Sequence, residues 1–129
     1  MSIQVEVSVG EFLDKLAILE IKAERMTDPA KLANVRRELA TLRSIWQGSP
    51  YLRLDLAAER LALKGINERL WDIEDEIRDK ERARTFDTGF IELARSVYLC
   101  NDRRAEIKKA INAATGSALI EEKSYREYR

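Results

Sequence analysis

Residues 56–77 read LAAERLALKGINERLWDIEDEI, and the spacing of their apolar side chains decides the fold class. An apolar side chain recurs every seven residues at Leu56, Leu63, Leu70 and Ile77, with Ile66 and Ile73 between them. Seven residues are close to two helical turns, so these side chains share one face of a helix. We predict a helix over residues 50–84, with Ser49 as its cap and Pro50 in its first turn.

A helix over residues 9–26 is predicted on the amino-terminal side. Ser8 and Glu11 have the spacing of a capping box, in which each side chain bonds the other residue's free backbone N–H. Val7 and Phe12 occupy the two positions of a hydrophobic staple around that cap.

Two more helices complete the predicted fold. Asp28 followed by Pro29 begins a helix over 29–47, and Asp87 can cap a helix over 88–114. Because short connections force helix hairpins, we predict a mainly α, four-helix antiparallel bundle in a single domain over 1–129. The long third and fourth helices form a hairpin, and the first two helices pack on it.

A short β-strand is predicted over residues 3–8. Ile3, Val5 and Val7 alternate with polar residues, and a period of two is typical of a strand. A lone strand leaves backbone N–H and C=O groups unpaired on both edges. Its partner is either residues 118–122, at the start of the C-terminal tail 118–129, or the same strand of a second copy.

The first helix is apolar on more than one face, because Leu13, Ile18 and Ile21 lie outside its main stripe. Such a helix is buried on more than one face. It is either central in the fold or covered by another subunit, and together with the strand this favours a homodimer. Trp71 lies beside the stripe of its helix, as an interface anchor or as a ring packed over a neighbouring helix. The predicted interface residues are Ile3, Val5, Val7, Leu13, Ile18, Ile21 and Trp71.

Composition excludes several classes of function. Of 129 residues, 23 are Lys or Arg and 23 are Asp or Glu, and this net charge of +0 argues against a general nucleic-acid binder. The absence of histidine excludes Ser-His, Cys-His and His-metal chemistry. Cys100 is the only cysteine and is expected to be a small core residue. No signal peptide or membrane-length apolar run is visible, so we expect a soluble cytoplasmic protein without membrane insertion.

An acidic run on the third predicted helix permits two interpretations. Asp72, Asp75, Glu76 and Asp79 share a face and, with Glu20 and Glu24, are similar to the Mg²⁺ site of all-α nucleotide pyrophosphatases. The paired-motif spacing of those enzymes is not reproduced. Alternatively, Glu74 with Arg78 and Glu76 with Lys80 are i, i+4 ion pairs of a solvated face. We favour the solvated face and predict no metal and no cofactor.

A second enzyme-like set consists of cations that could clamp a dicarboxylate, as in all-α chorismate mutases. Arg103, Arg104 and Lys108, with Lys15 or Lys22, could supply them. Alternatively, Lys108 complements the dipole at the end of its helix.

Arg104 falls in the apolar stripe of the fourth predicted helix, so a carboxylate should face it. Asp14, Glu20 and Glu24 are the accessible choices. The pair is then structural or part of a ligand clamp. The candidate ligand-binding residues are Arg103, Arg104, Lys108, Glu20 and Glu24, and no catalytic residue is assigned.

Nearly the whole chain resembles an uncharacterised bacterial family of small helical proteins, a domain of unknown function. The matching stretches are 7–15, 18–22, 32–39, 70–78, 94–98, 101–104, 116–117 and 121–125. The resemblance implies a bacterial origin, and some relatives accompany glycosyltransferases of surface-polysaccharide synthesis. It implies no role for any residue.

The function predicted from the sequence is a non-catalytic, homo-oligomeric helical module that binds another bacterial protein. The resemblance implies a role accessory to surface-polysaccharide synthesis. The alternative is a small all-α enzyme that binds an anionic metabolite or nucleotide through Arg, Lys and carboxylates.

Overall fold

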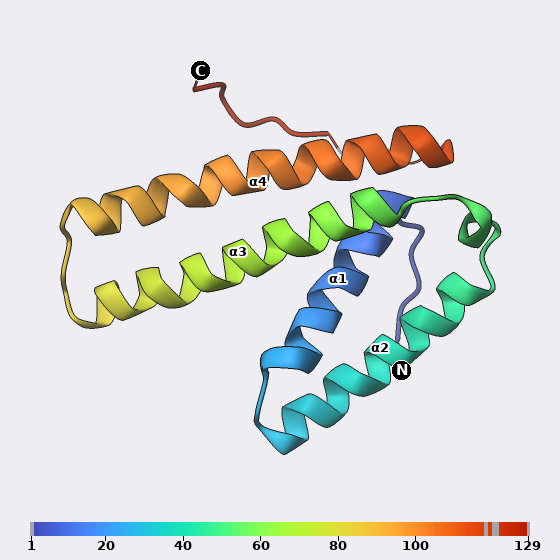
Figure 1. Cartoon of the computed structure of the whole chain (residues 1–129), viewed down its shortest axis with the longest axis horizontal. Helices are drawn as coiled ribbons and strands as arrows, with labels where there is room; N and C mark the ends of the chain where they lie inside the picture. Colours follow the sequence, from blue (N-terminus) through green and yellow to red (C-terminus); the bar gives the residue numbers. More distant parts are fainter. Residues whose placement is uncertain (1, 118, 120–121, 129) are drawn as a thin grey trace.

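The computed structural model describes residues 2–117, 119 and 122–128. Its helices are α1 (Val9–Arg25), α2 (Pro29–Gln47), α3 (Ala57–Arg82) and α4 (Thr88–Thr115), with a short 3₁₀ helix, η1 (Pro50–Arg53), between α2 and α3 (Figure 1). The prediction of a mainly helical protein is confirmed. The predicted ranges 9–26, 29–47 and 88–114 agree with α1, α2 and α4 to within one residue at each end.

Three of the helices begin at caps that the sequence predicted. The Ser8 hydroxyl accepts a hydrogen bond from the Glu11 N–H, and the Asp28 carboxylate accepts from the first free N–H groups of α2. Asp87 accepts from the Phe90 N–H at 3.0 Å. These oxygens satisfy backbone donors that have no partner within the helix, which fixes where each helix starts.

The predicted start of the third helix at residue 50 is wrong. Pro50 begins only η1, and the chain is irregular until α3 begins at Ala57. The Asp55 carboxylate accepts from the Ala57 N–H at 3.3 Å, and the buried Leu56 is the N-cap residue. The chain therefore has a second start signal at Asp55, and the interruption lets Tyr51 stack on Trp46 at 6.4 Å.

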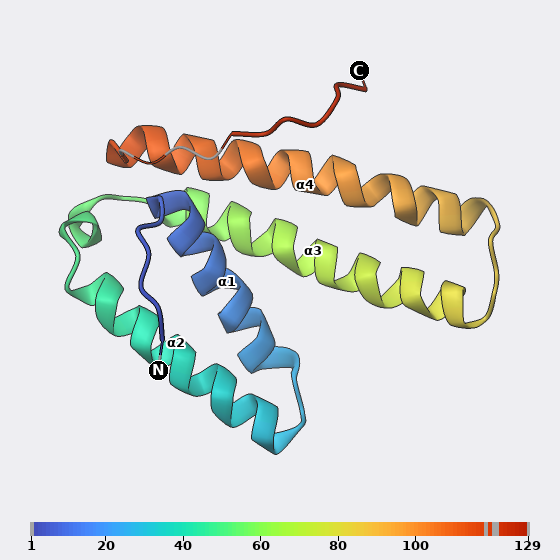
Figure 2. The same cartoon turned by 180° about the vertical axis from the view of Figure 1, so that it is seen from behind.

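Helix α1 lies at the centre of the molecule. It packs against α2 on one side and against both α3 and α4 on the other, while α3 and α4 form a long antiparallel hairpin (Figures 1 and 2). The buried core joins Leu13, Leu16 and Leu19 of α1 to side chains of the other three helices. The two apolar faces of α1 are thus covered within one chain. The expected cover of the α3–α4 hairpin by α2 is wrong, because α2 packs chiefly on α1.

No β-strand is formed by the described residues, so the predicted strand over 3–8 is wrong. Residues 2–8 are irregular, and Ile3 and Val5 are 91% and 75% exposed. A strand requires an edge that accepts its backbone groups, and the described chain provides none. Ala118, Ile120 and Glu121, which belong to the alternative partner segment, lie outside the described residues.

The α3–α4 hairpin extends well beyond α1 and α2, as Figure 1 shows, and ends in a two-helix tip. At the tip, the rings of Phe86 and Phe90 meet edge to face at 5.2 Å. Phe86 remains 57% exposed and Ile91 56% exposed, because no third helix covers them. The hairpin therefore has a covered end beside α1 and an uncovered end at the tip.

Candidate functional site

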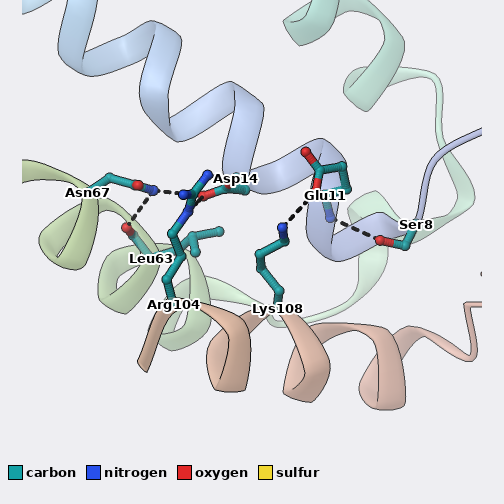
Figure 3. Close-up of polar contacts among 7 residues, drawn as sticks. All are labelled: Ser8, Glu11, Asp14, Leu63, Asn67, Arg104 and Lys108. Atoms are coloured by element: carbon teal, nitrogen blue, oxygen red, sulfur yellow. Dashed lines mark hydrogen bonds and ion pairs between the residues drawn. The ribbon is translucent and has the colours of Figure 1, made fainter. Parts of the chain in front are cut away.

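A group of buried and partly buried polar residues lies where α1 crosses the hairpin, and we call it the polar seam (Figure 3). Its members are Glu11 and Asp14 of α1, Asn67 of α3, and Arg104, Lys108 and Asn112 of α4. The seam runs along the contact between α1 and α4, with α3 closing one end. Because unpaired polar groups are costly inside a protein, each member needs a partner.

Asp14 is the centre of the seam. Its side chain is 1% exposed and accepts hydrogen bonds from both Nε and a terminal nitrogen of Arg104. The Nε–Oδ1 distance is 2.9 Å, and this two-point contact matches the planar guanidinium to the carboxylate. The prediction that a carboxylate faces Arg104 is confirmed, and Asp14 is that carboxylate.

Asn67 completes the environment of Asp14. Its amide donates to Asp14 Oδ1 at 2.8 Å and to the Leu63 carbonyl of the same helix at 3.1 Å. Asp14 thus accepts three hydrogen bonds in a site that excludes water. Breaking such a buried pair by removal of one partner typically costs about 3–5 kcal/mol, because it leaves a buried charge uncompensated.

Lys108 and Glu11 form a second ion pair one helical turn along the seam. The distance from Lys108 Nζ to Glu11 Oε2 is 2.6 Å, and Lys108 is a buried residue. Of the predicted capping box, the Ser8 half is formed, whereas the Glu11 carboxylate accepts from Lys108 of α4. The explanation of Lys108 as a charge that only complements the helix dipole is therefore incomplete.

Gly10 lets α1 and α4 approach closely at the end of the seam. Its N–H donates to Asn112 Oδ1 at 2.7 Å. A Cβ at residue 10 would lie 2.5 Å from the Lys108 carbonyl oxygen, a distance that requires the helices to separate. In contrast, a Cβ at Gly65 of α3 would meet nothing within 4 Å, so no close helix approach occurs at that glycine.

The structure separates the candidate ligand-binding residues into three places. Arg104 and Lys108 belong to the seam, whereas Arg103 is exposed and pairs with Glu106 at 3.3 Å. Glu20 and Glu24 face α3: Glu20 lies 3.7 Å from Arg60, and Glu24 accepts a hydrogen bond from Lys64. They therefore do not converge on the α4 cations.

The other cations proposed for a clamp also lie apart. Lys15 pairs with Glu38 of α2 at 3.0 Å, and Lys22 is partly exposed on α1.

The acidic run of α3 does not gather around one point. Asp72 pairs with Arg25 of α1 at 2.6 Å, and Glu74 forms the predicted i, i+4 pair with Arg78 at 3.1 Å. Lys80 donates to Asp87 at 3.1 Å, in place of the expected pair with Glu76. In the part of the chain that the structure describes, no three His, Cys, Asp or Glu side chains lie close enough to hold a metal ion.

The predicted interface residues have two different environments. Leu13 and Ile21 are fully buried inside the chain, and Ile18 is partly buried. Among the predicted interface residues, only Ile3, Val5 and Val7 are exposed, and all three belong to the segment 2–8. Trp71 is partly buried with the Arg25 guanidinium 5.9 Å from its ring centre, which matches the alternative of a ring packed beside a neighbouring helix.

A cavity of about 660 Å³ lies between α4 and the C-terminal segment. Its lining includes three lysines and four carboxylates, which are Lys108, Lys109, Lys123, Asp102, Glu106, Glu122 and Glu127.

Asp102 of α4 holds the C-terminal segment in place. It accepts hydrogen bonds from Lys123 and from the Tyr128 hydroxyl. The Tyr128 ring also packs edge to face on Tyr98 at 4.8 Å. These contacts hold the C-terminal segment beside the cavity, which adjoins the seam at Lys108 and Asn112.

Asp87 and Lys64, which lie outside the seam, have shifted pKa values. The Phe90 N–H, followed by Lys80, stabilises the charged form of Asp87 and holds its pKa below the ordinary value. The hydrogen bond to Glu24 raises the pKa of Lys64, against a smaller opposing effect of burial.

Sequence reasoning missed four residues of the site: Glu11 as an ion-pair partner, Gly10 as a close-approach residue, Asn67 and Asn112. A signal was present for the two asparagines. Asn67 follows Leu63 by four residues, and Asn112 is adjacent to the apolar Ile111, so each lies at the edge of a core stripe. A polar side chain at such a position predicts a buried hydrogen bond.

In the described part of the chain, no helix has the length and apolar character needed to cross a membrane. Neither the curated proteins nor the solved structures give a match to this chain. A model of a protein family, DUF6165, described as a family of unknown function, matches residues 3–128. Because this match spans nearly the whole sequence, the chain belongs to the DUF6165 family.

Proposed function

We propose that this protein is a non-catalytic, homo-oligomeric helical module for protein–protein interaction, in which a second copy covers the segment 2–8. The observation that carries the proposal is the exposure of Ile3, Val5 and Val7 on a chain whose other predicted interface side chains are buried or partly buried. Water-exposed apolar side chains at alternating positions favour association.

Backbone pairing supplies the physical reason for a second copy. Residues 2–8 contain no proline, so every backbone N–H can donate. Two copies related by a two-fold axis can pair these segments as antiparallel strands and place Ile3, Val5 and Val7 of both on one face. Pairing of strand edges is a common mode of recognition.

The contacts of the polar seam support a structural role for Arg104 and Lys108. Two cations of a possible clamp, the partly buried Arg104 and the buried Lys108, are held by Asp14 and Glu11 in contacts that fix α1 on α4. A group that anchors the fold in this way is poorly suited to exchange partners with a substrate during turnover.

Light scattering after size-exclusion chromatography at micromolar concentration tests the proposal. We expect the wild type to be a dimer and Val5→Lys with Val7→Lys to shift it toward monomer. The matched control, Gln4→Lys with Glu6→Lys, alters the other side of the same segment and should leave the dimer intact. A wild type that remains monomeric overturns the proposal.

The wider role that we propose is an accessory one in bacterial surface-polysaccharide synthesis, alongside a glycosyltransferase. Only the family resemblance supports this step. Affinity purification of the tagged full chain from the native bacterium tests it. Recovery of a polysaccharide-synthesis protein by wild type, with its loss in the segment 2–8 variant, is the supporting result. Recovery of unrelated proteins alone is the opposing one.

The second candidate function is binding of an anionic metabolite or nucleotide, and the cavity beside α4 is the place proposed for it. Three lysines line the cavity together with four carboxylates, and Lys108 and Lys123 already contact Glu11 and Asp102. A thermal-shift screen with nucleotides, Mg²⁺ and dicarboxylates tests this candidate. A ligand at 100 times its Kd adds about 2.7 kcal/mol to the free energy of unfolding, so a flat screen contradicts it.

A further inference from the structure

The outer surface of α2 is basic. This helix carries four cations, Lys31, Arg36, Arg37 and Arg43, and one carboxylate, Glu38. Glu38 pairs with Lys15 of α1, and all four cations are exposed. None of the four forms an ion pair with any carboxylate that the structure describes. Arg36 and Arg43 share one flank of α2, whereas Lys31 and Arg37 lie about 100–140° around the helix axis from them, so we call Arg36 and Arg43 the basic face.

Arg36 and Arg43 give the basic face a defined spacing. They are seven residues apart, which places them on the same flank of α2 at a separation of about 10.5 Å along the axis. Val35, Leu39 and Trp46 are buried in the core, so the packing of α2 on α1 fixes the direction of this flank.

The exposed side of α3 near the tip has the opposite charge. Residues 68–81 contain seven carboxylates and three cations. We define the acidic face as Asp72, Asp75, Glu76 and Asp79, all of which are exposed. Arg25, the last residue of α1, pairs with Asp72, so the other three lie beyond the end of α1. Those three have no ion-pair partner among residues 2–117, 119 and 122–128.

We propose that the basic face of α2 docks on the acidic face of α3 in a second copy of this chain. This inference rests on the proposed function, since it names a contact by which the copies associate. Asp72 and Asp79 have the same seven-residue spacing as Arg36 and Arg43. Asp72 also pairs with Arg25 of its own chain, but its side chain is 62% exposed and can contact a second cation, so two antiparallel helices can align both pairs of charges. A two-fold axis makes the contact twice, once for each α2.

Charge complementarity favours a second copy of this chain over a nucleic acid or an anionic membrane as the partner of the basic face. The chain has a net charge of +0, with a positive excess on α2 and a negative excess on residues 68–81 of α3. A nucleic acid or an anionic membrane would attract the basic face and repel the acidic face of the same molecule. A second copy satisfies both faces together, and complementary fields also orient the encounter.

Charge reversal with rescue tests the inference, with the dimer Kd measured by sedimentation equilibrium on the full chain. One variant carries Arg36→Glu with Arg43→Glu, and the other carries Asp75→Lys with Asp79→Lys. Each should self-associate about tenfold more weakly than wild type or worse, because like charges then face each other. An equimolar mixture of the two variants should form a heterodimer with a Kd close to that of wild type.

A matched control and a salt titration complete the test. Arg95→Glu with Arg126→Glu changes the net charge as much as the first variant, but on α4 and the C-terminal segment, and should leave the dimer Kd unchanged. Raising NaCl from about 0.1 M to about 1 M shortens the Debye length from about 10 Å to about 3 Å and should weaken the wild-type dimer. The salt titration remains decisive if a variant fails to fold by circular dichroism.

The outcomes separate this inference from the proposed function. A wild-type dimer that neither salt nor charge reversal weakens overturns the basic-face contact and leaves the proposed function standing. A wild type that is monomeric at low salt overturns both. If Arg36→Glu with Arg43→Glu abolishes binding to duplex DNA or to anionic vesicles while the dimer Kd is unchanged, the occupant of the basic face is a different anion and the inference is overturned.

Discussion

The covered end and the tip of the α3–α4 hairpin have very different surroundings. At the covered end, Leu63 and Ile111 are completely buried, and Arg104 reaches a buried carboxylate of α1. At the tip, Phe86 and Ile91 are more than half exposed, and the ion pairs are between exposed side chains. The difference arises from α1, which supplies a third helix at only one end. Burial, and with it stability, depends here on packing more than on periodicity.

The largest expected effect comes from the centre of the polar seam. Arg104→Met leaves Asp14 charged and buried without its main partner, so we expect the free energy of unfolding to fall by about 3–5 kcal/mol in urea denaturation. Arg103→Met, at the adjacent exposed position, should change it by no more than about 0.5 kcal/mol. Equal effects of the two variants would remove the distinction between seam and surface.

The second comparison is between the effects on stability of alanine at Gly10 and at Gly65. Gly10→Ala places a methyl group against the Lys108 carbonyl, and we expect it to destabilise the protein by about 1–3 kcal/mol. Gly65→Ala meets open space inside a helix and should stabilise the protein by about 0.5–1 kcal/mol. Thermal unfolding measures both. Destabilisation of similar size in the two variants would contradict the close approach of α1 and α4 at residue 10.

Hydrogen exchange sharpens the comparison of the two ends without a mutation. Amides of α3 near Leu63 and of α4 near Ile111 should open only with global unfolding, because their side chains are fully buried. Amides near Asp79 and Phe90 should exchange at least about tenfold faster, since two helices alone hold the tip. Uniform protection along the whole hairpin would show that something else stabilises the tip.

The smallest effect is a pH dependence at the tip. The pKa of Asp87 is lower in the folded chain than its ordinary value, so its contribution to stability is present above that value. The contribution is lost as the pH falls through the folded pKa. Asp87→Asn keeps a capping side chain and should flatten the acid limb of a plot of Tm against pH. Asp75→Asn is the control, because Asp75 lies within α3 and caps no helix, and it should leave the acid limb unchanged.

Local signals in the sequence predicted the helices well. Ser8, Asp28 and Asp87 each act within three residues of the backbone groups that they cap, so the sequence alone locates them. The start of α3 was missed because Pro50 and Asp55 are both valid start signals. Which of the two begins the long helix depends on the packing of Tyr51 on Trp46, a contact that no local pattern contains.

The site was predictable only in part. The position of Arg104 in an apolar stripe required a carboxylate, and Asp14 was among the three expected. The choice among them depends on how α1 crosses α4, because Glu20 and Glu24 lie on the part of α1 that faces Lys64. The central position of α1 was one of two alternatives, and the sequence alone did not select it. A strand, in turn, needs a neighbouring edge that periodicity cannot supply.

The bond from Gly10 to Asn112 joins residues that are 102 positions apart, and it has a consequence for biosynthesis. The first helix to leave the ribosome completes its contacts only after the last helix has emerged. At elongation rates of about 5–20 residues per second, the apolar residues of α1 wait roughly 5–20 s for their final partners. During that interval the apolar side chains of α1 are exposed and can bind a chaperone. Slowing translation upstream of residue 112 should lengthen the time for which these side chains are exposed.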